Sequence, residues 1–387
     1  MRALPVVVIG AGPQGLAAAA QLLEHGETPL VFEAGPGPTA AVSDWGHVRL
    51  FSDWSELVDD AAARLLAPTG WARPATGYPT GAQWISSYLA PLAAALGDSV
   101  RCGTRVTGVS RAGRDRLAGS GHSKQPFSVH IADADGIESR VAARAVIDAS
   151  GTWSQPNPAG ADGLPALGET AASDRITYRI PDFASPERFA GAHTVVVGSG
   201  HSAATAVTAL AGIARRHPGT RVTWVLRRGT VPDVSGGTAD VLPARGVLGL
   251  RAQEAVDSGL VDSVTGFRVA SVTRLKGGVV LASEDGRELP AADAVVVLTG
   301  FRPDLSFLSE IRLDLDPTLQ APSRMAAVVD PNLHSCGTVR VTGATELAHP
   351  EADFYLVGAK SYGRAPTFLA ATGYEQVRSV VAALAGG

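Results

Sequence analysis

The sequence predicts an α/β protein in which one structural unit occurs twice. An apolar strand, a glycine-rich turn and an alanine-rich helix follow one another at residues 5–23, and the same order returns at 193–216. Each unit is followed later in the chain by a short apolar strand that ends on a hydroxyl residue and a glycine. Strand, tight turn and helix in this order are typical of parallel sheets with helical crossovers. The 387 residues suffice for about two to three domains.

The composition argues against several classes of protein. Apolar residues make up 45% of the chain and charged residues 18%, and the formal net charge is −4, which argues against disorder and against a surface for nucleic acid. The two cysteines, Cys102 and Cys336, cannot form a C-x-x-C redox pair or a disulfide framework. The sequence contains no apolar run long enough to cross a membrane, and its first apolar stretch runs into the glycine turn at residue 10 and not into a signal-cleavage site. We therefore expect a cytoplasmic protein with no nucleic-acid, membrane or metal partner.

The first unit predicts a site for a dinucleotide. Its turn reads Gly10-Ala11-Gly12-Pro13-Gln14-Gly15 and leads into a helix that continues to Leu23. A second strand at 29–32 ends in Glu33. This acid follows the turn by about 20 residues, where a carboxylate can accept hydrogen bonds from ribose hydroxyls. Glycines let the pyrophosphate approach the helix N-terminus. The predicted contacts are Gly10, Gly12, Pro13, Gln14, Gly15 and Glu33.

The second unit predicts another dinucleotide site with a different preference. Its turn reads Gly198-Ser199-Gly200-His201-Ser202-Ala203, with alanine at the third small position. The strand at 221–226 ends in two arginines instead of an acid, which suits a ribose 2′-phosphate and favours NADPH over NADH. His201 is expected in the loop near the phosphates and not as a catalytic base. The predicted contacts are Gly198, Ser199, Gly200, His201, Ser202, Arg227 and Arg228.

Two short apolar strands predict where the chain passes between the units. The strand at 145–149 ends in Ser150-Gly151 and is followed by a proline-rich crossing, and the strand at 294–298 ends in Thr299-Gly300. Between each glycine turn and its hinge strand we expect a β meander. These signals predict a first domain at 1–155 and 300–387, a second domain at 190–295 inserted into it, and crossing linkers at 156–189 and 296–304.

The C-terminal part is expected to complete the first domain. A strand at 353–358 ends in Gly358, and residues 366–384 show helical spacing of apolar side chains. This closing helix is expected to begin around Pro366 and Thr367. Its N-terminus carries a partial positive charge, and we expect it to face the redox-active ring of the dinucleotide bound by the first unit, where negative charge develops on reduction.

These motifs together resemble the two-dinucleotide-binding-domain flavoproteins, in which the first motif holds FAD and the second holds NAD(P)H. The resemblance implies two Rossmann-like domains of three-layer ββα type. Within that superfamily the chain resembles the flavin-containing (class B) monooxygenases, through residues 45–50, Tyr78-Pro79 and the Ser150-Gly151 crossing. The stretch from Glu346 to Phe368 is similar to a subgroup of small flavoprotein monooxygenases, some of them associated with arsenic-resistance operons.

The resemblance implies a function and further site residues. It implies that NADPH reduces FAD, that the reduced flavin captures dioxygen as a C4a-hydroperoxide, and that one oxygen atom passes to a small nitrogen, sulfur or arsenic nucleophile. The resemblance is also compatible with a homodimer. The further FAD contacts are expected to be Trp54, Val106, Ser150, Gly151, Gly358 and Thr367, the further NADPH contacts Thr299 and Gly300, and the catalytic pocket residues Arg49, Tyr362 and Arg364.

One departure from the family pattern keeps two other functions open. The fingerprint F-x-G-x-x-x-H-x-x-x-(Y/W) is expected before the second glycine turn, but here Leu167 and Gly168 lead to Ala172 in the place of the histidine, and Tyr178 is the nearest aromatic residue. This departure weakens the prediction of oxygenation. It does not affect the predicted FAD and NADPH sites, because they depend on other residues. An NADPH-dependent flavin reductase or oxidase remains the main alternative, and a non-catalytic redox-sensing module the lesser one.

Overall fold

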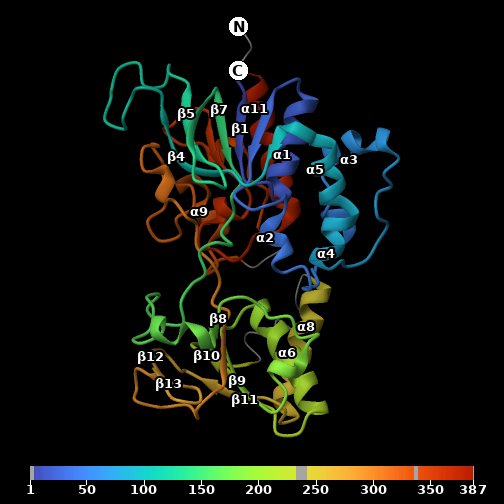
Figure 1. The fold of residues 1–387 in the computed structure, drawn as a ribbon, viewed down its shortest axis with the longest axis vertical. Helices are drawn as coiled ribbons and strands as arrows, with labels where there is room; N and C mark the ends of the chain where they lie inside the picture. The colour runs from blue at the N-terminus through green and yellow to red at the C-terminus, as the bar shows by residue number, and fades with distance from the viewer. Residues whose placement is uncertain (1–3, 232–241, 335–338, 387) are drawn as a thin grey trace. The chain divides into compact units, whose positions relative to one another are not determined.

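The structure is a computed structural model that describes residues 4–231, 242–334 and 339–386. It divides into two compact units (Figure 1). Unit 1 combines Met1–Gln155 with Arg302–Gly387, and unit 2 is the continuous segment Pro156–Phe301. Cys336 lies outside the described residues, so the structure says nothing of it.

Both units contain helices and strands. The elements of unit 1 are β1 (Val6–Ile9), α1 (Pro13–Glu24), β2 (Pro29–Phe32), α2 (Ala40–Ser43), η1 (Trp54–Glu56), α3 (Asp60–Leu66), η2 (Ala67–Thr69), α4 (Gly81–Trp84), η3 (Ile85–Leu89), α5 (Ala90–Leu96), η4 (Gly97–Ser99), β3 (Val100–Arg101), β4 (Arg105–Arg111), β5 (Phe127–Ala132), β6 (Glu138–Ala143), β7 (Ala145–Asp148), η8 (Ser306–Leu308), α9 (Ser323–Val329), α10 (Ala344–Leu347), β15 (Phe354–Leu356), η9 (Gly358–Tyr362) and α11 (Ala370–Ala385). The elements of unit 2 are η5 (Thr170–Arg175), β8 (Ile176–Thr177), η6 (Pro186–Arg188), β9 (His193–Val197), α6 (His201–Arg216), β10 (Arg221–Leu226), α8 (Pro243–Asp257), β11 (Asp262–Thr265), β12 (Val269–Arg274), β13 (Val279–Ser283) and β14 (Ala294–Val297).

Unit 1 is built in three layers. A parallel sheet in the order β15-β7-β1-β2-β3 forms the middle layer. Because side chains alternate along a strand, Val7 and Ile9 of β1 join an apolar cluster with the antiparallel sheet β4-β5-β6, whereas Val6 and Val8 join a cluster with the helices. Figure 1 shows β4 and β5 on one side of β1 and β7, with α1 and α5 on the other.

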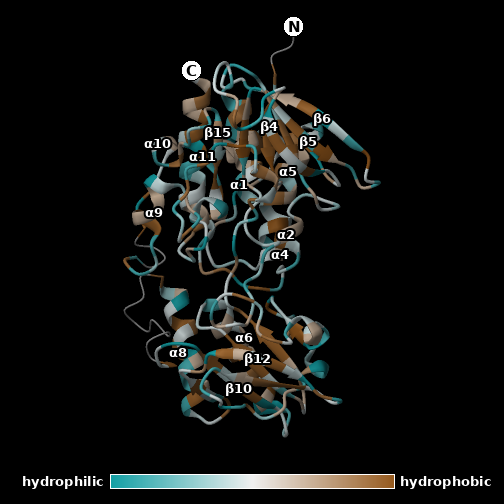
Figure 2. Cartoon of the chain, turned by 90° about the vertical axis from the view of Figure 1, so that its left-hand side faces the viewer, coloured by the Kyte–Doolittle hydropathy of each residue, from teal (hydrophilic) through white to brown (hydrophobic). Residues whose placement is uncertain are grey.

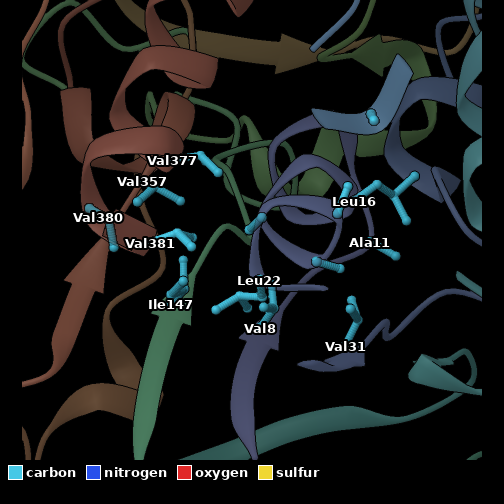
Figure 3. Packing of buried hydrophobic residues seen from close by; sticks show 14 of the residues in the cluster. Val8, Ala11, Leu16, Leu22, Val31, Ile147, Val357, Val377, Val380 and Val381 are labelled. Atoms are coloured by element: carbon cyan, nitrogen blue, oxygen red, sulfur yellow. The ribbon is translucent and has the colours of Figure 1, made fainter. Parts of the chain in front are cut away.

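The helical side of unit 1 holds its largest core. Helix α1 packs against α3, α5 and α11. Leu16 of α1 and Val377 and Val381 of α11 are completely buried. Figure 3 shows these side chains together with Val8 and Ile147 from the neighbouring strands. This core fixes α1, and with it the turn at its N-terminus, against the carboxyl ends of β1 and β7.

Unit 2 repeats the architecture. Its parallel sheet runs β11-β10-β9-β14-β8. Val196 of β9 faces a cluster with α6 and α8, whereas Val195 and Val197 face a cluster with the hairpin β12-β13. The inner strands β1 and β7 of unit 1 and β9 and β14 of unit 2 are mostly apolar and buried. Figure 2 shows hydrophobic residues in brown along β5 and β12 as well. The predicted α/β class with two Rossmann-like three-layer domains is confirmed.

Three expectations about boundaries are wrong. Residues 156–189 were expected to be a linker but belong to unit 2, because β8 pairs with β14 and Phe189 is buried in the core beside α6. Likewise β14 is a central strand of that unit and no linker. The closing helix begins at Ala370, four residues later than the expected start at Pro366. No helix in the described part of the chain is long and apolar enough to cross the membrane.

His349 makes the stability of unit 1 sensitive to acid. Burial lowers the pKa of His349 to about 4, although its ring accepts a hydrogen bond from the Asp314 amide at 3.2 Å. The folded pKa is below the unfolded value of about 6.5, so the unfolded state binds the proton more readily and stability falls as the pH drops from about 6.5 to 4. We expect His349→Gln to remove up to about 3 kcal/mol of this loss.

Chemical denaturation of the wild type and of His349→Gln at pH 7 and pH 4.5 measures the effect. The glutamine side-chain oxygen can still accept from the Asp314 amide, so the variant is a close match at neutral pH. Identical pH dependence in the two proteins would contradict the assignment.

Candidate dinucleotide-binding sites

The glycine turn of unit 1 leaves no room for side chains at two of its positions. Gly10 has a φ of +95°, and a Cβ there would lie 2.9 Å from the Cα of Ser150. A Cβ on Gly15 would lie 1.9 Å from the carbonyl oxygen of Gly10. These two glycines are therefore required by the fold of the turn itself, which brings β1, α1 and the end of β7 into direct contact.

Gly12 is a glycine for a different reason. It has an extended backbone that any residue can adopt, and a Cβ on it would meet nothing within 4 Å. Gly12 is the N-cap of α1, and no side chain caps the helix. The first intrahelical bond runs from the Leu16 amide to the Gly12 carbonyl at 2.9 Å, and the amides before it have no carbonyl partner within the helix. Open space beside an uncapped helix N-terminus fits a pyrophosphate.

Glu33 is held at the end of β2 by backbone amides. Its two carboxylate oxygens accept from the amides of Ala11 and Gly35, each at 2.8 Å. A carboxylate oxygen has more than one acceptor position, so Glu33 can still accept from ribose hydroxyls. The structure thus brings together the predicted residues of the turn and the acid, and their arrangement fits FAD.

At the end of β7 lies a buried ion pair that the sequence analysis missed. Lys360 Nζ lies 2.6 Å from Asp148 Oδ2, and both side chains are completely buried. The same ammonium donates to Ser150 Oγ at 2.9 Å, and Ser150 itself is exposed. The two charged residues lie far apart in the sequence, and no local motif joins them. Gly151 follows with a φ of +68° and open space at its Cβ position.

Gln14 occupies a slot between two glycines. Its side chain is 6% exposed and donates to the Ala370 carbonyl oxygen at 3.2 Å. A Cβ on Gly358 would lie 2.8 Å from Gln14 Cγ, and a Cβ on Gly373 would lie 2.6 Å from Gln14 Cδ. The first turn of α1, the first residue of η9 and the first turn of α11 therefore meet at the side-chain amide of Gln14. Pro13 is the first residue of α1.

The glycine turn of unit 2 has the same division of roles. Gly198 has a φ of +137°, and a Cβ on it would lie 2.3 Å from the Leu298 carbonyl oxygen. A Cβ on Gly200 would meet nothing within 4 Å, and this residue is the N-cap of α6 without a capping side chain. Ser199 precedes it in the turn. His201, expected in the loop, is the first residue of α6, with Ser202 next.

The two arginines after β10 are both exposed. Arg227 Nη1 donates to the Ala161 carbonyl oxygen at 2.7 Å, which orients this guanidinium. Partial burial and then the charge of Arg228 lower the pKa of Arg227 from its ordinary value. Two cations beside each other at the carboxyl end of a strand favour a dianionic group between them.

Thr299 and Gly300 hold the end of β14. Thr299 Oγ1 donates to the carbonyl oxygens of Asn157 and Pro158 at 3.0 and 3.1 Å, and Asn157 Nδ2 donates back to the Thr299 carbonyl at 3.0 Å. Gly300 has a φ of +91°. The hydroxyl of Thr299 is thus engaged with the protein, and a nucleotide contact at these two residues stays a prediction.

The predicted pocket residues have different environments. Arg49 is exposed and donates to the Tyr78 carbonyl oxygen. The Arg364 side chain is exposed, while its amide bonds the Leu319 carbonyl at 2.7 Å. Both remain candidates for contact with a substrate. Trp54 begins η1 and is 8% exposed in the core of unit 1.

Three further predicted residues are placed in the interior. Tyr362 is completely buried in the core of unit 1, and its hydroxyl donates to Thr372 Oγ1 at 3.2 Å. Its role as a catalytic residue stays a prediction. Thr367 lies three residues before α11, and its hydroxyl donates to the Val329 carbonyl at 3.2 Å, so it is not the N-terminus of that helix. Val106 packs in the cluster between the two sheets.

The segment of the degraded fingerprint has a structural role. Gly168 has a φ of +81°, and Ala172 is completely buried. Tyr178 donates to the buried Glu169 carboxylate at 2.7 Å, which also accepts from the amides of Ala159 and Ala166. No sequence motif had pointed to Glu169. Among the described residues, no three His, Cys, Asp or Glu side chains gather as a metal site would require.

The fold and the two glycine turns define a protein with two dinucleotide-binding domains. The family described as pyridine nucleotide-disulphide oxidoreductase matches residues 7–325 of the sequence. The chain belongs to this oxidoreductase family. No curated protein matches the sequence at a significant level.

Several solved structures share the fold. A bacillithiol disulfide reductase from Bacillus cereus has a TM-score of 0.72 at 19% identity, covering 100% of this chain and 99% of its own. A flavin-containing monooxygenase from Stenotrophomonas maltophilia has a TM-score of 0.60 at 24% identity, covering 99% and 100%. An ornithine hydroxylase from Pseudomonas aeruginosa has a TM-score of 0.64 at 15% identity, covering 99% of both chains. At these identities the likeness shows the fold alone.

Proposed function

We propose that the chain is an FAD-dependent monooxygenase that uses NADPH and dioxygen to oxygenate a small nitrogen-, sulfur- or arsenic-centred nucleophile. One observation, made in both units, supports the binding of the two cofactors. The N-cap residue of an uncapped helix is a glycine with open space beside it, Gly12 in unit 1 and Gly200 in unit 2. When bound, FAD would accept a hydride and, once reduced, react with dioxygen. The protein supplies binding and orientation.

The residues of unit 1 would hold FAD by its polar parts. The uncapped N-terminus of α1 would bind the pyrophosphate, and Glu33 would accept from the ribose hydroxyls. In unit 2, the uncapped N-terminus of α6 would bind the NADPH pyrophosphate, and the exposed pair Arg227 and Arg228 would bind the 2′-phosphate.

The two cysteines of the chain argue against the disulfide exchange that the family description names, and therefore favour oxygenation. Cys102 is half-buried, and burial first, then the charge of Glu33, raises the pKa of its thiol. A thiol with a raised pKa is a poor nucleophile. Cys102 and Cys336 are the two cysteines of the chain, so no C-x-x-C pair is available for exchange with a disulfide substrate.

A flavin reductase or oxidase is the second candidate, and one observation favours it. The histidine position of the monooxygenase fingerprint is filled by Ala172, which is completely buried, and the preceding Leu167 is 78% exposed. A monooxygenase must retain oxygen at the flavin, whereas a reductase only passes electrons onward. Because the fingerprint is typical of the monooxygenases, a chain that lacks it also fits a reductase or an oxidase. Reoxidation of the flavin distinguishes the two.

The experiment begins with FAD-loaded protein reduced anaerobically by NADPH. Mixing it rapidly with oxygenated buffer, with and without NADP⁺, while recording the flavin absorbance follows reoxidation. We expect a transient absorbance that differs from both the reduced and the oxidised flavin and lasts longer with NADP⁺. Immediate return to the oxidised spectrum with stoichiometric release of hydrogen peroxide would contradict the monooxygenase and favour the reductase or oxidase.

A further inference from the structure

The buried ion pair between Lys360 and Asp148 lies directly behind the FAD site proposed above. The two charged atoms are 2.6 Å apart, and neither side chain has any exposed surface. Asp148 is the last residue of β7, and Lys360 lies in η9, just after β15. The ammonium also lies 4.3 Å from the centre of the Phe307 ring. The pair therefore ties β7 to the segment after β15.

Stability does not explain such a pair. Removing two opposite charges from water costs several kcal/mol per ion, and a buried pair commonly contributes no more than apolar side chains of similar volume would. A buried pair is better explained when its geometry is needed at a neighbouring site. Here the neighbour is Ser150, whose hydroxyl and amide both bond Asp148 Oδ1, at 2.6 and 3.0 Å.

Ser150 transmits this geometry to the glycine turn. It is exposed, it accepts from Lys360 Nζ at 2.9 Å, and its Cα would be 2.9 Å from a Cβ on Gly10. One exposed residue thus contacts both the buried charges and the turn at which the FAD pyrophosphate would lie. The backbone at 148–151 is held before any ligand arrives, which reduces the ordering cost of binding.

We propose that Lys360 and Asp148 are positioning residues for FAD, acting through Ser150 to fix the wall of the phosphate-binding turn. This inference rests on the proposed FAD site. Lys360 does not touch the cofactor in this account. Its function is to hold Ser150 against Gly10.

The test compares FAD dissociation constants of folded variants. Asp148→Asn combined with Lys360→Met removes both charges, while the asparagine oxygen can still accept from Ser150, so this pair variant is expected to fold. Ser150→Ala removes the exposed hydroxyl. We expect each to weaken FAD binding about tenfold. Because both act through one contact, combining them should weaken binding no further than the stronger of the two.

A matched control is available in the same unit. Arg111 and Glu351 form a second buried pair, with Nε and Oε1 2.7 Å apart and side chains 2% and 1% exposed. Arg111→Met with Glu351→Gln should leave FAD affinity unchanged, which separates a general effect of buried charge from positioning.

Two results would overturn the inference while the proposed function stands: wild-type affinity in the pair variant, or effects of the pair variant and Ser150→Ala that multiply when combined. Failure of the wild-type protein to bind FAD at all would instead overturn the proposed function. Unchanged unfolding of the pair variant in denaturant, together with weaker FAD binding, is the expected combination.

Discussion

Replacing Gly12 by alanine is expected to leave the protein folded and to weaken FAD binding roughly 10- to 100-fold. The added Cβ meets no protein atom within 4 Å, and the backbone of Gly12 is extended, so nothing in the turn resists it. The methyl group would instead occupy the space where the pyrophosphate approaches the helix. An extra methyl in a close contact costs about 1–3 kcal/mol, which corresponds to that loss of affinity.

The equivalent change in unit 2 makes the prediction specific. Gly200→Ala should weaken NADPH binding to a similar extent and leave FAD binding unchanged, because Gly200 has the same open surroundings at the start of α6. Gly119→Ala, another glycine with open space, is the control and should affect neither. Calorimetric titration of each variant measures both affinities. Normal FAD affinity in Gly12→Ala would place the cofactor elsewhere.

Replacing Arg227 and Arg228 together by alanine is expected to weaken NADPH binding roughly 10- to 100-fold, with little effect on NADH. Both side chains are exposed, and the hydrogen bond to Ala161 already orients Arg227. Because both arginines are exposed to solvent, their hydrogen bonds to the phosphate are expected to contribute about 1.5–3 kcal/mol together. The 2′-phosphate that would accept these hydrogen bonds is absent from NADH.

The control lies on the same strand. Arg221 begins β10, at the end away from the two arginines, and is also exposed. Arg221→Ala should leave the preference for NADPH unchanged. Rates of flavin reduction, measured across a range of NADPH and NADH concentrations, give the preference of each variant for NADPH over NADH. Equal weakening of both nucleotides in the double variant would remove the assignment of the 2′-phosphate to these arginines.

The local parts of the sites could be predicted from the sequence because their residues are neighbours in the chain. The strand, turn and helix around Gly10 and around Gly198 follow from apolar runs and glycines in order, and Glu33 follows from the end of β2. Steric conditions within a few residues decide these features. The architecture of both units followed from that pattern.

The remaining features depend on contacts between distant segments. Lys360 meets Asp148 only after β15 joins β7, and no periodicity signals that pairing. Tyr362 is predicted to line the pocket because the loop before the last helix flanks the flavin in the resembling family, and the structure buries its side chain completely in the core under α11. Residues 156–189 lack long elements, yet β8 adds them to the sheet of unit 2 through only two residues.

Anaerobic titration of the FAD-loaded protein with NADPH is the decisive measurement for the proposed function, because it requires both nucleotide sites and the transfer of a hydride from NADPH to FAD. We expect that the absorbance of oxidised flavin is lost with about one NADPH per flavin, and that NADH is much less effective. Retained flavin that stays oxidised in excess NADPH, or a chain that retains no FAD, would contradict it.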